Sequence, residues 1–398
     1  MPRELRLYRL GGALGYDSRV PEEFGSYLIL EQLGVGGMAS VHLAESKSVR
    51  KRVALKRLLE HAAEQPDLVE AFVHEARLAR FLHHANIAQT FDFGKVEGTY
   101  FIAMEFVSGP TLAQLTRQCN ATVGMIPIPI ILNILCQICD ALDHAHNCTD
   151  ESGQPLHIVH RDVSPPNLII SNSGMVKLID FGLAKAMTSR QTQAGVIKGK
   201  FSYVAPEYLK GKLDARADLW ALGVVAHELL TGERLFDAND DFKTLDRVRD
   251  MTILPPSQRN AEVPHDLDDI VLTALERDPA RRWQSAGAMR NALDGVAKQL
   301  GRITNQVVLE WVEWAFEQRP GARDQSGVSQ LIAMLEQPSR PAARAKAKTP
   351  PALPRVGAAM LTRRKSRRTA VLLALLVVVA AGAAASWYFD LPRYLLSP

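Results

Sequence analysis

Cysteine is scarce in this chain of 398 residues, which contains only Cys119, Cys136, Cys139 and Cys148. Cys136 and Cys139 form a C-x-x-C pair, a spacing that also occurs in zinc and redox sites. Both lie in residues 130–145, a strongly apolar helical stretch with no second pair of ligands. We therefore expect them to be buried helical residues that act as small hydrophobes. Because nothing indicates disulfides, the sequence places the folded part in a reducing compartment.

Two other features are missing, and acidic residues are scarce near the C-terminus. Residues 1–24 contain scattered arginines but no apolar core, so they do not form a signal peptide. No base-reading motif is present. Residues 337–398 hold one of the 43 Asp and Glu but eleven of the 47 Lys and Arg, which leaves 42 acidic and 36 basic residues before them. The isoelectric point of about 8.8 therefore comes from the tail, and we expect no nucleic-acid partner for the folded part.

The most informative motif lies between residues 160 and 182. His160-Arg161-Asp162 is followed by Asn167 and then by Asp180 in an Asp-Phe-Gly triplet, each beside a short apolar strand. This spacing supplies a candidate proton acceptor, an amide and a carboxylate. Phosphoryl transfer from a nucleotide requires a group that orients the attacking hydroxyl and ligands for Mg²⁺. The motif therefore predicts that chemistry.

A glycine-rich run, residues 33–41, lies between two strand-like segments upstream. Glycines let backbone N–H groups approach phosphates closely, although such a run on its own is also typical of a simple turn. The next segment, Val53-Ala54-Leu55-Lys56, is a short apolar strand with one lysine. Its lysine either points to solvent or has a buried partner.

Glu75 is the natural partner for Lys56. Residues 67–83 are predicted to form a helix with Asp67 as its N-cap, and Glu75 lies in the middle of its apolar face. A carboxylate in that position is costly unless it is paired. The pair would hold two elements together, and it could also hold Lys56 against phosphates; these two interpretations are compatible.

Three further motifs follow in order: Ala205-Pro206-Glu207, the run from Asp218 to Gly223, and Asp278-Pro279-Ala280-Arg281-Arg282. With the motifs above, the chain resembles the eukaryotic-like (Hanks-type) protein kinase family in its bacterial serine/threonine branch, over about residues 25–300. The resemblance implies an α+β, two-lobed fold, with a small β-rich lobe at 25–107 and a large helical lobe at 108–300.

The resemblance also implies roles for individual residues. Asp162 would accept or orient the substrate proton, Lys56 held by Glu75 would bind the α- and β-phosphates, and Asn167 and Asp180 would hold Mg²⁺, or alternatively Mn²⁺. Support for the site would come from Glu207, Asp218 and Arg282. The expected ATP-binding residues are Leu33, Gly34, Val35, Gly36, Gly37, Val41, Ala54, Lys56, Glu105 and Val107.

Three positions depart from the family pattern. Ala39 replaces the third glycine of the loop, Ser164 replaces a catalytic-loop lysine, and Lys200 replaces a threonine before Ala-Pro-Glu. One interpretation is an exchange, in which Lys200 is the catalytic cation that approaches Asp162 and the γ-phosphate, with Ser164 as its hydroxyl partner. The alternative is an exposed, solvated Lys200. The departures leave the choice between serine/threonine and tyrosine substrates open.

By the same resemblance, Arg161 marks the kinase subclass in which a basic pocket binds a phosphate on the activation segment, which here is residues 180–207. Thr192 is the favoured phosphorylation candidate, with Thr188 and Ser189 as alternatives. A phosphate there would order the segment through charge-assisted hydrogen bonds. An ordinary polar loop is the competing interpretation.

The C-terminal part divides into four segments. Residues 301–336 are expected to form a helical extension whose Trp311, Trp314 and Phe316 pack on the large lobe; a partner-docking face is the alternative. Residues 337–368 read as a basic, disordered Pro/Ala-rich linker. Residues 369–389 are predicted to be a transmembrane helix, because 370–389 carries no charge and is long enough to span a bilayer. Residues 390–398 would be a short external tail.

Arginines and lysines directly precede the predicted span, and Trp387-Tyr388-Phe389 closes it. This pattern favours a single-pass protein of the bacterial inner membrane with its kinase domain in the cytoplasm. A nine-residue tail is too short for a ligand-binding domain, so input would come through a partner or a homodimer. Gly382 and Ser386 offer a small-residue face for helix contact, although any Ala-rich span offers such spacings.

We therefore expect a membrane-anchored enzyme that transfers the γ-phosphate of ATP to serine or threonine hydroxyls of protein substrates and autophosphorylates. A nucleotide-binding pseudokinase scaffold is the first alternative, and the retained Lys56, Asp162, Asn167 and Asp180 argue against it. A small-molecule phosphotransferase is the second, and the Ala-Pro-Glu segment argues against that.

Overall fold

The computed structural model describes residues 21–181, 201–210, 213–238, 240–319 and 327–336. The first part of the chain forms β1 (Glu22–Phe24), β2 (Tyr27–Val35), β3 (Ala39–Ser46), β4 (Arg52–Leu58), α2 (Glu60–Ala63), α3 (Pro66–Ala79), β5 (Thr90–Val96) and β6 (Thr99–Glu105). The strands form one antiparallel sheet in the order β1-β2-β3-β4-β6-β5. Because β1 pairs with β2, the sheet begins at Glu22, before the domain boundary expected at residue 25.

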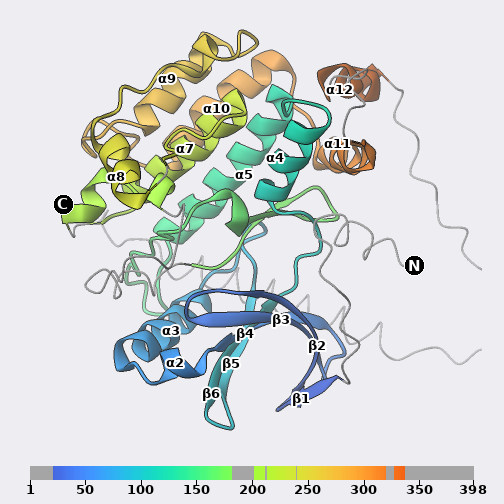
Figure 1. Cartoon of the computed structure of the whole chain (residues 1–398), viewed down its shortest axis with the longest axis vertical. Coiled ribbons are helices and arrows are strands. Elements are labelled where there is room, and N and C mark those ends of the chain that lie inside the picture. The colour runs from blue at the N-terminus through green and yellow to red at the C-terminus, as the bar shows by residue number, and fades with distance from the viewer. Residues whose placement is uncertain (1–20, 182–200, 211–212, 239, 320–326, 337–398) are drawn as a thin grey trace, which may run out of the picture. The chain divides into compact units, whose positions relative to one another are not determined.

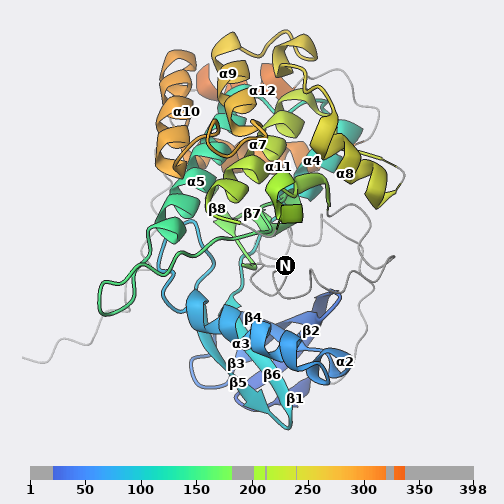
Figure 2. The same ribbon diagram turned by 90° about the vertical axis from the view of Figure 1, so that its left-hand side faces the viewer.

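Both faces of this sheet bury apolar side chains, and α3 covers one of them (Figure 2). On that face Leu68 and Phe72 of α3 pack with Ile102 and Met104 of β6. The opposite face carries an aromatic cluster in which the ring centroids of Phe24 and Phe101 lie 5.7 Å apart, at 88° to each other. The sheet therefore holds β4, and Lys56 on it, between two apolar layers.

The predicted start and end of α3 were wrong. The helix begins at Pro66 with Gln65 as its N-cap, and it ends at Ala79 rather than at residue 83. Proline is favoured at the first helical position because its φ is already helical and its missing N–H would have no partner there. Asp67 therefore lies in the first turn, where its charge complements the helix dipole.

The second part is mainly helical, as expected (Figure 1). It contains α4 (Leu112–Ala121), α5 (Ile128–His146), η1 (Pro165–Asn167), β7 (Leu168–Ile170), β8 (Val176–Leu178), η2 (Phe201–Tyr203), η3 (Pro206–Lys210), α7 (Arg216–Thr231), α8 (Asp241–Asp250), η4 (Pro256–Gln258), α9 (His265–Ala274) and α10 (Ala286–Leu300). Its core is built around α5 and α7, and Trp220 of α7 is fully buried against Phe236.

Among the described residues, α5 has the length and composition of a membrane span, but most of it is buried inside the protein. It is therefore the core helix of this lobe. Cys136 and Cys139 lie on it as free thiols, and the described part of the chain contains no cluster of three His, Cys, Asp or Glu side chains that could hold a metal. The prediction that they are buried is confirmed for Cys139, whereas Cys136 is only partly buried against the core.

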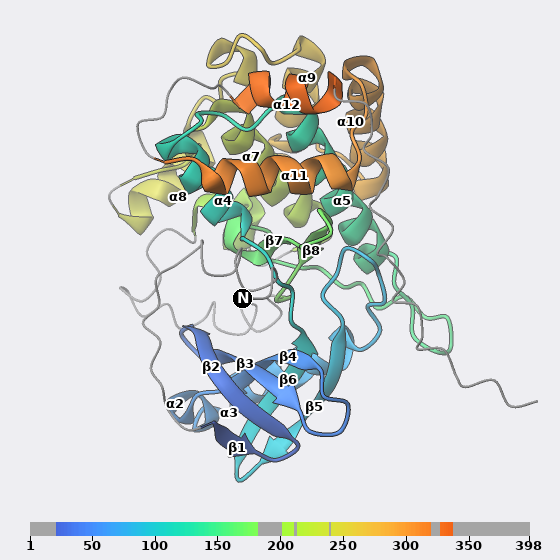
Figure 3. The same cartoon turned by 90° about the vertical axis from the view of Figure 1, so that its right-hand side faces the viewer.

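The predicted helical extension is present as α11 (Asn305–Glu317) and α12 (Gly327–Glu336), and α11 crosses in front of α4 and α5 (Figure 3). Trp311 is fully buried, Phe316 is buried and Trp314 is partly buried against the large-lobe core. The indole N–H of Trp311 donates to the carbonyl oxygen of Gly327 at 3.0 Å, which ties α12 to α11. The prediction that these aromatic residues pack on the large lobe is confirmed.

Several predicted features lie outside the described residues. They are Thr188, Ser189, Thr192, Lys200, the linker 337–368, the span 369–389 with its small-residue face, and the tail 390–398.

Candidate active site

Lys56 is the centre of a three-residue charge cluster. It is buried on β4, and its Nζ lies 2.7 Å from Oε1 of Glu75 on α3 and 3.1 Å from Oδ1 of Asp180. Burial alone would lower the pKa of Lys56, but the two carboxylates outweigh it and raise that pKa above its ordinary value. The ammonium group therefore stays charged, and the predicted partnership of Lys56 with Glu75 is confirmed.

Residues 160–167 are the expected catalytic loop, and hydrogen bonds within this loop hold it in place. Nδ2 of Asn167 donates to the carbonyl oxygen of Asp162 at 2.9 Å, and Oγ of Ser164 donates to the same oxygen at 3.3 Å. The backbone N–H of Asp162 donates to Nδ1 of His160 at 3.2 Å. These bonds fix the loop backbone around Asp162, so its carboxylate is carried by a rigid turn.

Asp218, near the start of α7, braces this loop from below. Its carboxylate accepts the backbone N–H groups of His160 and Arg161, both at 2.8 Å, and it also bonds to Nε2 of His146 at 2.8 Å. Burial would raise the pKa of Asp218, but the hydrogen bond from His146 and the backbone donors lower it overall. Asp218 therefore makes the backbone contacts expected of a supporting residue, with His146 as a partner that the sequence did not indicate.

Asp180 and Phe181 follow β8 directly. The N–H of Ile179 donates to the carbonyl oxygen of Asn167 at 3.0 Å, and Phe181 is buried with its ring 4.5 Å from that of His160. Asp180 and Arg161 have φ of 55° and 65°. This left-handed conformation is unfavourable for residues other than glycine, and it is common at functional sites. From this position Asp180 reaches Lys56 of the small lobe, and Nε of Arg161 is buried.

The glycine-rich loop connects β2 and β3 above Lys56. In the strand register Val41 lies opposite both Gly34 and Lys56. A side chain added at Gly34 or Gly37 would meet no atom within 4 Å, so backbone lines open space there. Such a loop can offer N–H groups to phosphates.

The expected adenine side of the site is formed by β4, β6 and the segment after β6. Ala54 lies opposite Met104 in the sheet, and Met104 lines a small cavity together with Phe181. The carboxylate of Glu105 pairs with Nζ of Lys177 at 2.8 Å, so its side chain is bound to β8. Glu105 can therefore serve a nucleotide through its backbone. The remaining expected contacts are Leu33 and Val35 on β2, Gly36 in the loop and the buried Val107 after β6.

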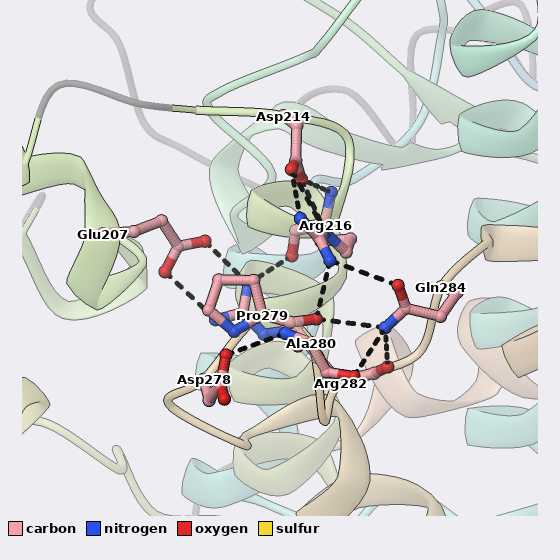
Figure 4. A network of polar contacts seen from close by, with 8 residues as sticks. All are labelled: Glu207, Asp214, Arg216, Asp278, Pro279, Ala280, Arg282 and Gln284. Carbon is pink, nitrogen blue, oxygen red and sulfur yellow. Dashed lines mark hydrogen bonds and ion pairs between the residues drawn. The ribbon is translucent and has the colours of Figure 1, made fainter.

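Glu207 and Arg282 form the predicted buried brace (Figure 4). The guanidinium donates to both carboxylate oxygens, with NH1 to Oε1 at 2.8 Å and NH2 to Oε2 at 3.1 Å. Arg282 also donates to the carbonyl oxygens of Arg216 and Glu276, and its charged group lies 5.3 Å from the ring centroid of Trp220. The pair ties the Ala-Pro-Glu segment to the start of α7.

The residues present fit a nucleotide with a hard divalent cation. Asp180 supplies a carboxylate, and because the amide nitrogen of Asn167 bonds to Asp162, the amide oxygen of Asn167 is the atom it can offer to a cation. Oxygen donors of this kind suit Mg²⁺, which usually binds one or two protein groups together with substrate phosphates. One of the two expected ligands, Asp180, lies 3.1 Å from Nζ of Lys56, the predicted phosphate-binding residue.

Two polar groups of this region were missed by sequence reasoning. Asn86, in the segment between α3 and β5, bonds to Gln137 of α5 and to Val176 of β8 at 2.8 Å each. His84 and His144 stack with ring centroids 5.1 Å apart. Neither has a local sequence signal, because the partners are far apart in the chain and belong to no motif.

Together, this geometry is that of a nucleotide-dependent phosphotransferase with two lobes around the Lys56 cluster. Comparison with known proteins identifies the family. The protein kinase domain family matches residues 27–293, and the chain belongs to that family. The family uses ATP and Mg²⁺, as predicted.

Relatives come from several bacteria. The chain is 39% identical over 278 residues to the tyrosine-protein kinase MasK of Myxococcus xanthus, covering 69% of this chain and 43% of that protein. It is 34% identical over 360 residues to the serine/threonine-protein kinase Pkn1 of Myxococcus xanthus, covering 87% of this chain and 50% of that protein. It is 36% identical over 269 residues to the serine/threonine-protein kinase PrkC of Bacillus subtilis, covering 67% and 39%. The chain thus spans half or less of these relatives' length.

Solved structures agree with the fold. The kinase domain of Mycobacterium tuberculosis PknI superposes with a TM-score of 0.56 at 26% identity, covering 70% of this chain and 99% of that one. The two-lobed fold predicted from the motifs is confirmed.

Proposed function

We propose that this chain is an active protein kinase that transfers the γ-phosphate of ATP to serine or threonine hydroxyls of proteins. The observation that carries the proposal is the bonding of one buried lysine, Lys56, to both Glu75 and Asp180. A lysine, a helix carboxylate and a metal-binding aspartate that meet in this way are the parts that must be in place together for transfer. A nucleotide-binding scaffold without transfer would not need the complete set.

The chain's own residues would do three things in the reaction. Lys56 would hold the α- and β-phosphates while Glu75 fixes its direction. Asn167 and Asp180 would hold Mg²⁺, which neutralises the phosphate charge. Asp162 would orient the substrate hydroxyl and accept its proton. Positioning and electrostatic stabilisation supply most of the acceleration in such reactions, so the rigid support of Asp162 by Asn167 and Asp218 matters directly.

The hydroxyl acceptor is the finer part of the proposal. Relatives bear both names, since MasK is a tyrosine-protein kinase while Pkn1 and PrkC are serine/threonine-protein kinases. Ser164 bonds to the backbone of its own loop, which leaves the cationic role near the γ-phosphate to another residue. We assign that role to Lys200. The expected kinetic sign is a Lys200→Ala variant with a much lower kcat and little change in ATP affinity.

Regulation by phosphorylation is also proposed. Nε of Arg161 is buried and has no hydrogen-bond partner among the described residues. A phosphate on Thr192, or on Thr188 or Ser189, would satisfy it through a charge-assisted bond. Mass spectrometry of active enzyme should then find a phosphate between Asp180 and Glu207; an unmodified segment in fully active enzyme would reject this part.

Attachment to the bacterial inner membrane through residues 369–389 completes the proposal, with self-association of that span as one route for input. A chain that lacks residues 369–398 should move to the soluble fraction and keep its intrinsic activity. Continued sedimentation with membranes would contradict the anchor.

The central test is incubation with γ-labelled ATP and Mg²⁺, with and without a generic protein substrate, followed by phosphoamino-acid analysis. We expect label on serine or threonine of both the enzyme and the substrate. An Asp162→Asn variant should lose about 10²-fold or more of the rate while staying folded. Nucleotide binding without any transfer would favour the scaffold, and label on tyrosine alone would overturn the serine/threonine assignment.

A further inference from the structure

The strand β8 leads into Asp180, and the backbone groups on its outer edge are hydrogen-bonded by side chains and by a single parallel β-bridge between Ile87 and Leu178 rather than by a full neighbouring strand. The N–H of Val176 donates to Oε1 of Gln137 at 3.0 Å, and its carbonyl oxygen accepts from Nδ2 of Asn86 at 2.8 Å. At Leu178 the N–H donates to the carbonyl oxygen of Asn86 at 2.8 Å, and the carbonyl oxygen accepts from the N–H of Ala88 at 3.0 Å. An edge strand normally leaves such groups to solvent.

Gln137 joins this edge to the segment after α3. Its Oε1 also accepts from Nδ2 of Asn86 at 2.8 Å, so one side-chain oxygen serves both β8 and residues 84–88. Asn86 is itself buried. The side chain of Gln137 therefore fixes β8 against the segment that connects helix α3, and with it Glu75, to the sheet.

The same glutamine continues to the C-terminal extension. Its Nε2 donates to Oδ1 of Asn133 at 2.7 Å, and Nδ2 of Asn133 donates to the carbonyl oxygen of Ile303 at 3.2 Å, just before α11. Both nitrogens also lie 3.4 Å from Oδ1 of Asn305, the first residue of α11. A continuous chain of amides thus runs from the start of α11 to the backbone of β8.

A second contact joins the start of α11 to the β7–β8 pair. The turn between β7 and β8 contains Gly174, with φ of 71°, and a Cβ added there would lie 1.8 Å from the carbonyl oxygen of Asn305. The backbone of the turn therefore touches the first turn of α11 (Figure 3). Only glycine permits so close an approach.

We propose that the beginning of α11 sets the position of the metal-binding Asp180, acting through Asn133, Gln137 and the outer edge of β8. Gln137 and Asn133 are then positioning residues for phosphoryl transfer. The extension formed by α11 and α12 would therefore contribute to catalysis and not only to packing. Partners that orient a metal ligand typically contribute 10–100-fold to affinity or activity. The proposal rests on the proposed function for its kinetic consequence but not for its structural one.

The structural test needs no catalysis. Amide hydrogen exchange is measured on the full chain without nucleotide, for wild type, Gln137→Leu and Asn133→Leu. Both variants should exchange faster by about tenfold or more in residues 174–181, because local opening follows the loss of the bonds that hold an edge. Gln118→Leu is the matched control, because Nε2 of Gln118 anchors the other end of α11 by donating to the carbonyl oxygens of Ala315 and Gln318.

A glycine pair gives an independent arm. Gly174→Ala should speed exchange in the same residues, since its Cβ forces the turn away from α11. Gly153→Ala has a similar φ of 81° but open space around its Cβ, so it carries the same backbone strain without the contact. This pair remains informative even where Gln137→Leu does not fold.

The kinetic arm measures kcat, the KM for ATP and the half-saturating Mg²⁺ concentration well below the melting temperature. We expect Gln137→Leu and Asn133→Leu to lower kcat and to raise the Mg²⁺ requirement by about 10-fold or more, and Gln118→Leu to leave both unchanged. Exchange and Mg²⁺ dependence that match in Asn133→Leu and Gln118→Leu would overturn the proposal. A wild-type chain that transfers no phosphate would refute the proposed function and leave the exchange arms to decide this one.

Discussion

A carboxylate oxygen of Asp218 accepts the backbone N–H of His160 at 2.8 Å, so the helix in the core of the large lobe holds the catalytic loop directly. Asp218→Asn keeps only one acceptor oxygen and turns an amide toward a backbone donor. We expect it to lose about 2–3 kcal/mol in the free energy of unfolding, because buried donors are left without partners. It should also lower kcat, since the loop backbone is no longer fixed. Urea unfolding and steady-state kinetics check both.

Acid should expose the same interaction. The pKa of Asp218 lies below its ordinary value in the folded state, so its stabilising effect is complete above about pH 4 and is lost as the pH falls through the folded-state value. Asp218→Asn should lack this part of the acid dependence. Parallel stability curves for wild type and variant below pH 4 would contradict the assignment.

The buried pair between Arg282 and Glu207 predicts a large effect that an exposed pair does not share. Arg282→Leu leaves a buried carboxylate unpaired and should cost about 3–5 kcal/mol of unfolding free energy. The double change with Glu207→Leu should cost less than the sum of the single changes, because the two residues are in contact. Arg249→Leu, which removes an exposed partner of Asp250, is the control and should change stability little. The denaturant midpoints of these variants measure the changes in unfolding free energy.

The stacked rings of His84 and His144 should make stability fall at mildly acid pH. Burial lowers the pKa of both rings, and at His144 the neighbouring His84 and then His83 lower it further. At His84 the charge of Asp140 opposes the effect of burial, while Lys177 adds to it. The unfolded chain then binds more protons, so stability is greatest above about pH 6.5 and declines as the pH falls below it. His144→Phe keeps an aromatic ring and should flatten this decline.

The exposed His74 lies outside this pair, so His74→Phe is the control for replacing a histidine, measured between about pH 5 and 7. Urea midpoints across that range measure both variants. A His144→Phe chain with the wild-type slope would assign the acid dependence elsewhere.

The cysteines should be inert in the folded protein. Burial raises the pKa of Cys119 to about 12 and that of Cys136 to about 11, and it also raises that of Cys139. Only the thiolate reacts with alkylating reagents, so native protein at pH 8 should remain unmodified at these positions and become alkylated after denaturation. Mass spectrometry checks this. Rapid alkylation of Cys136 in native protein would reopen a redox role.

The sequence predicted those parts of the site that carry a physical demand. A carboxylate on the apolar face of α3 required a cation, and the chain offered Lys56 on the apolar strand that precedes this helix. The start of α3 was misplaced because Asp67 matched a capping pattern while Pro66 decided the first turn. No such demand marks Asn86 and Gln137, which lie 51 residues apart, since either could be an ordinary surface amide. Their roles arise only when α5, β8 and the segment after α3 are brought together.

The pairing of Lys56 with both Glu75 and Asp180 has a consequence for which form of the nucleotide binds. Lys56, Glu75 and Asp180 carry one positive and two negative charges, so Asp180 already has an internal counter-ion. In the proposed reaction Lys56 would bind phosphates and Asp180 would bind Mg²⁺, so each charged group would exchange one opposite charge for another. Metal-free ATP would instead bring phosphates beside a carboxylate that had just lost its cation. We expect the site to discriminate between metal-loaded and bare nucleotide by electrostatic exchange, before any step of phosphoryl transfer.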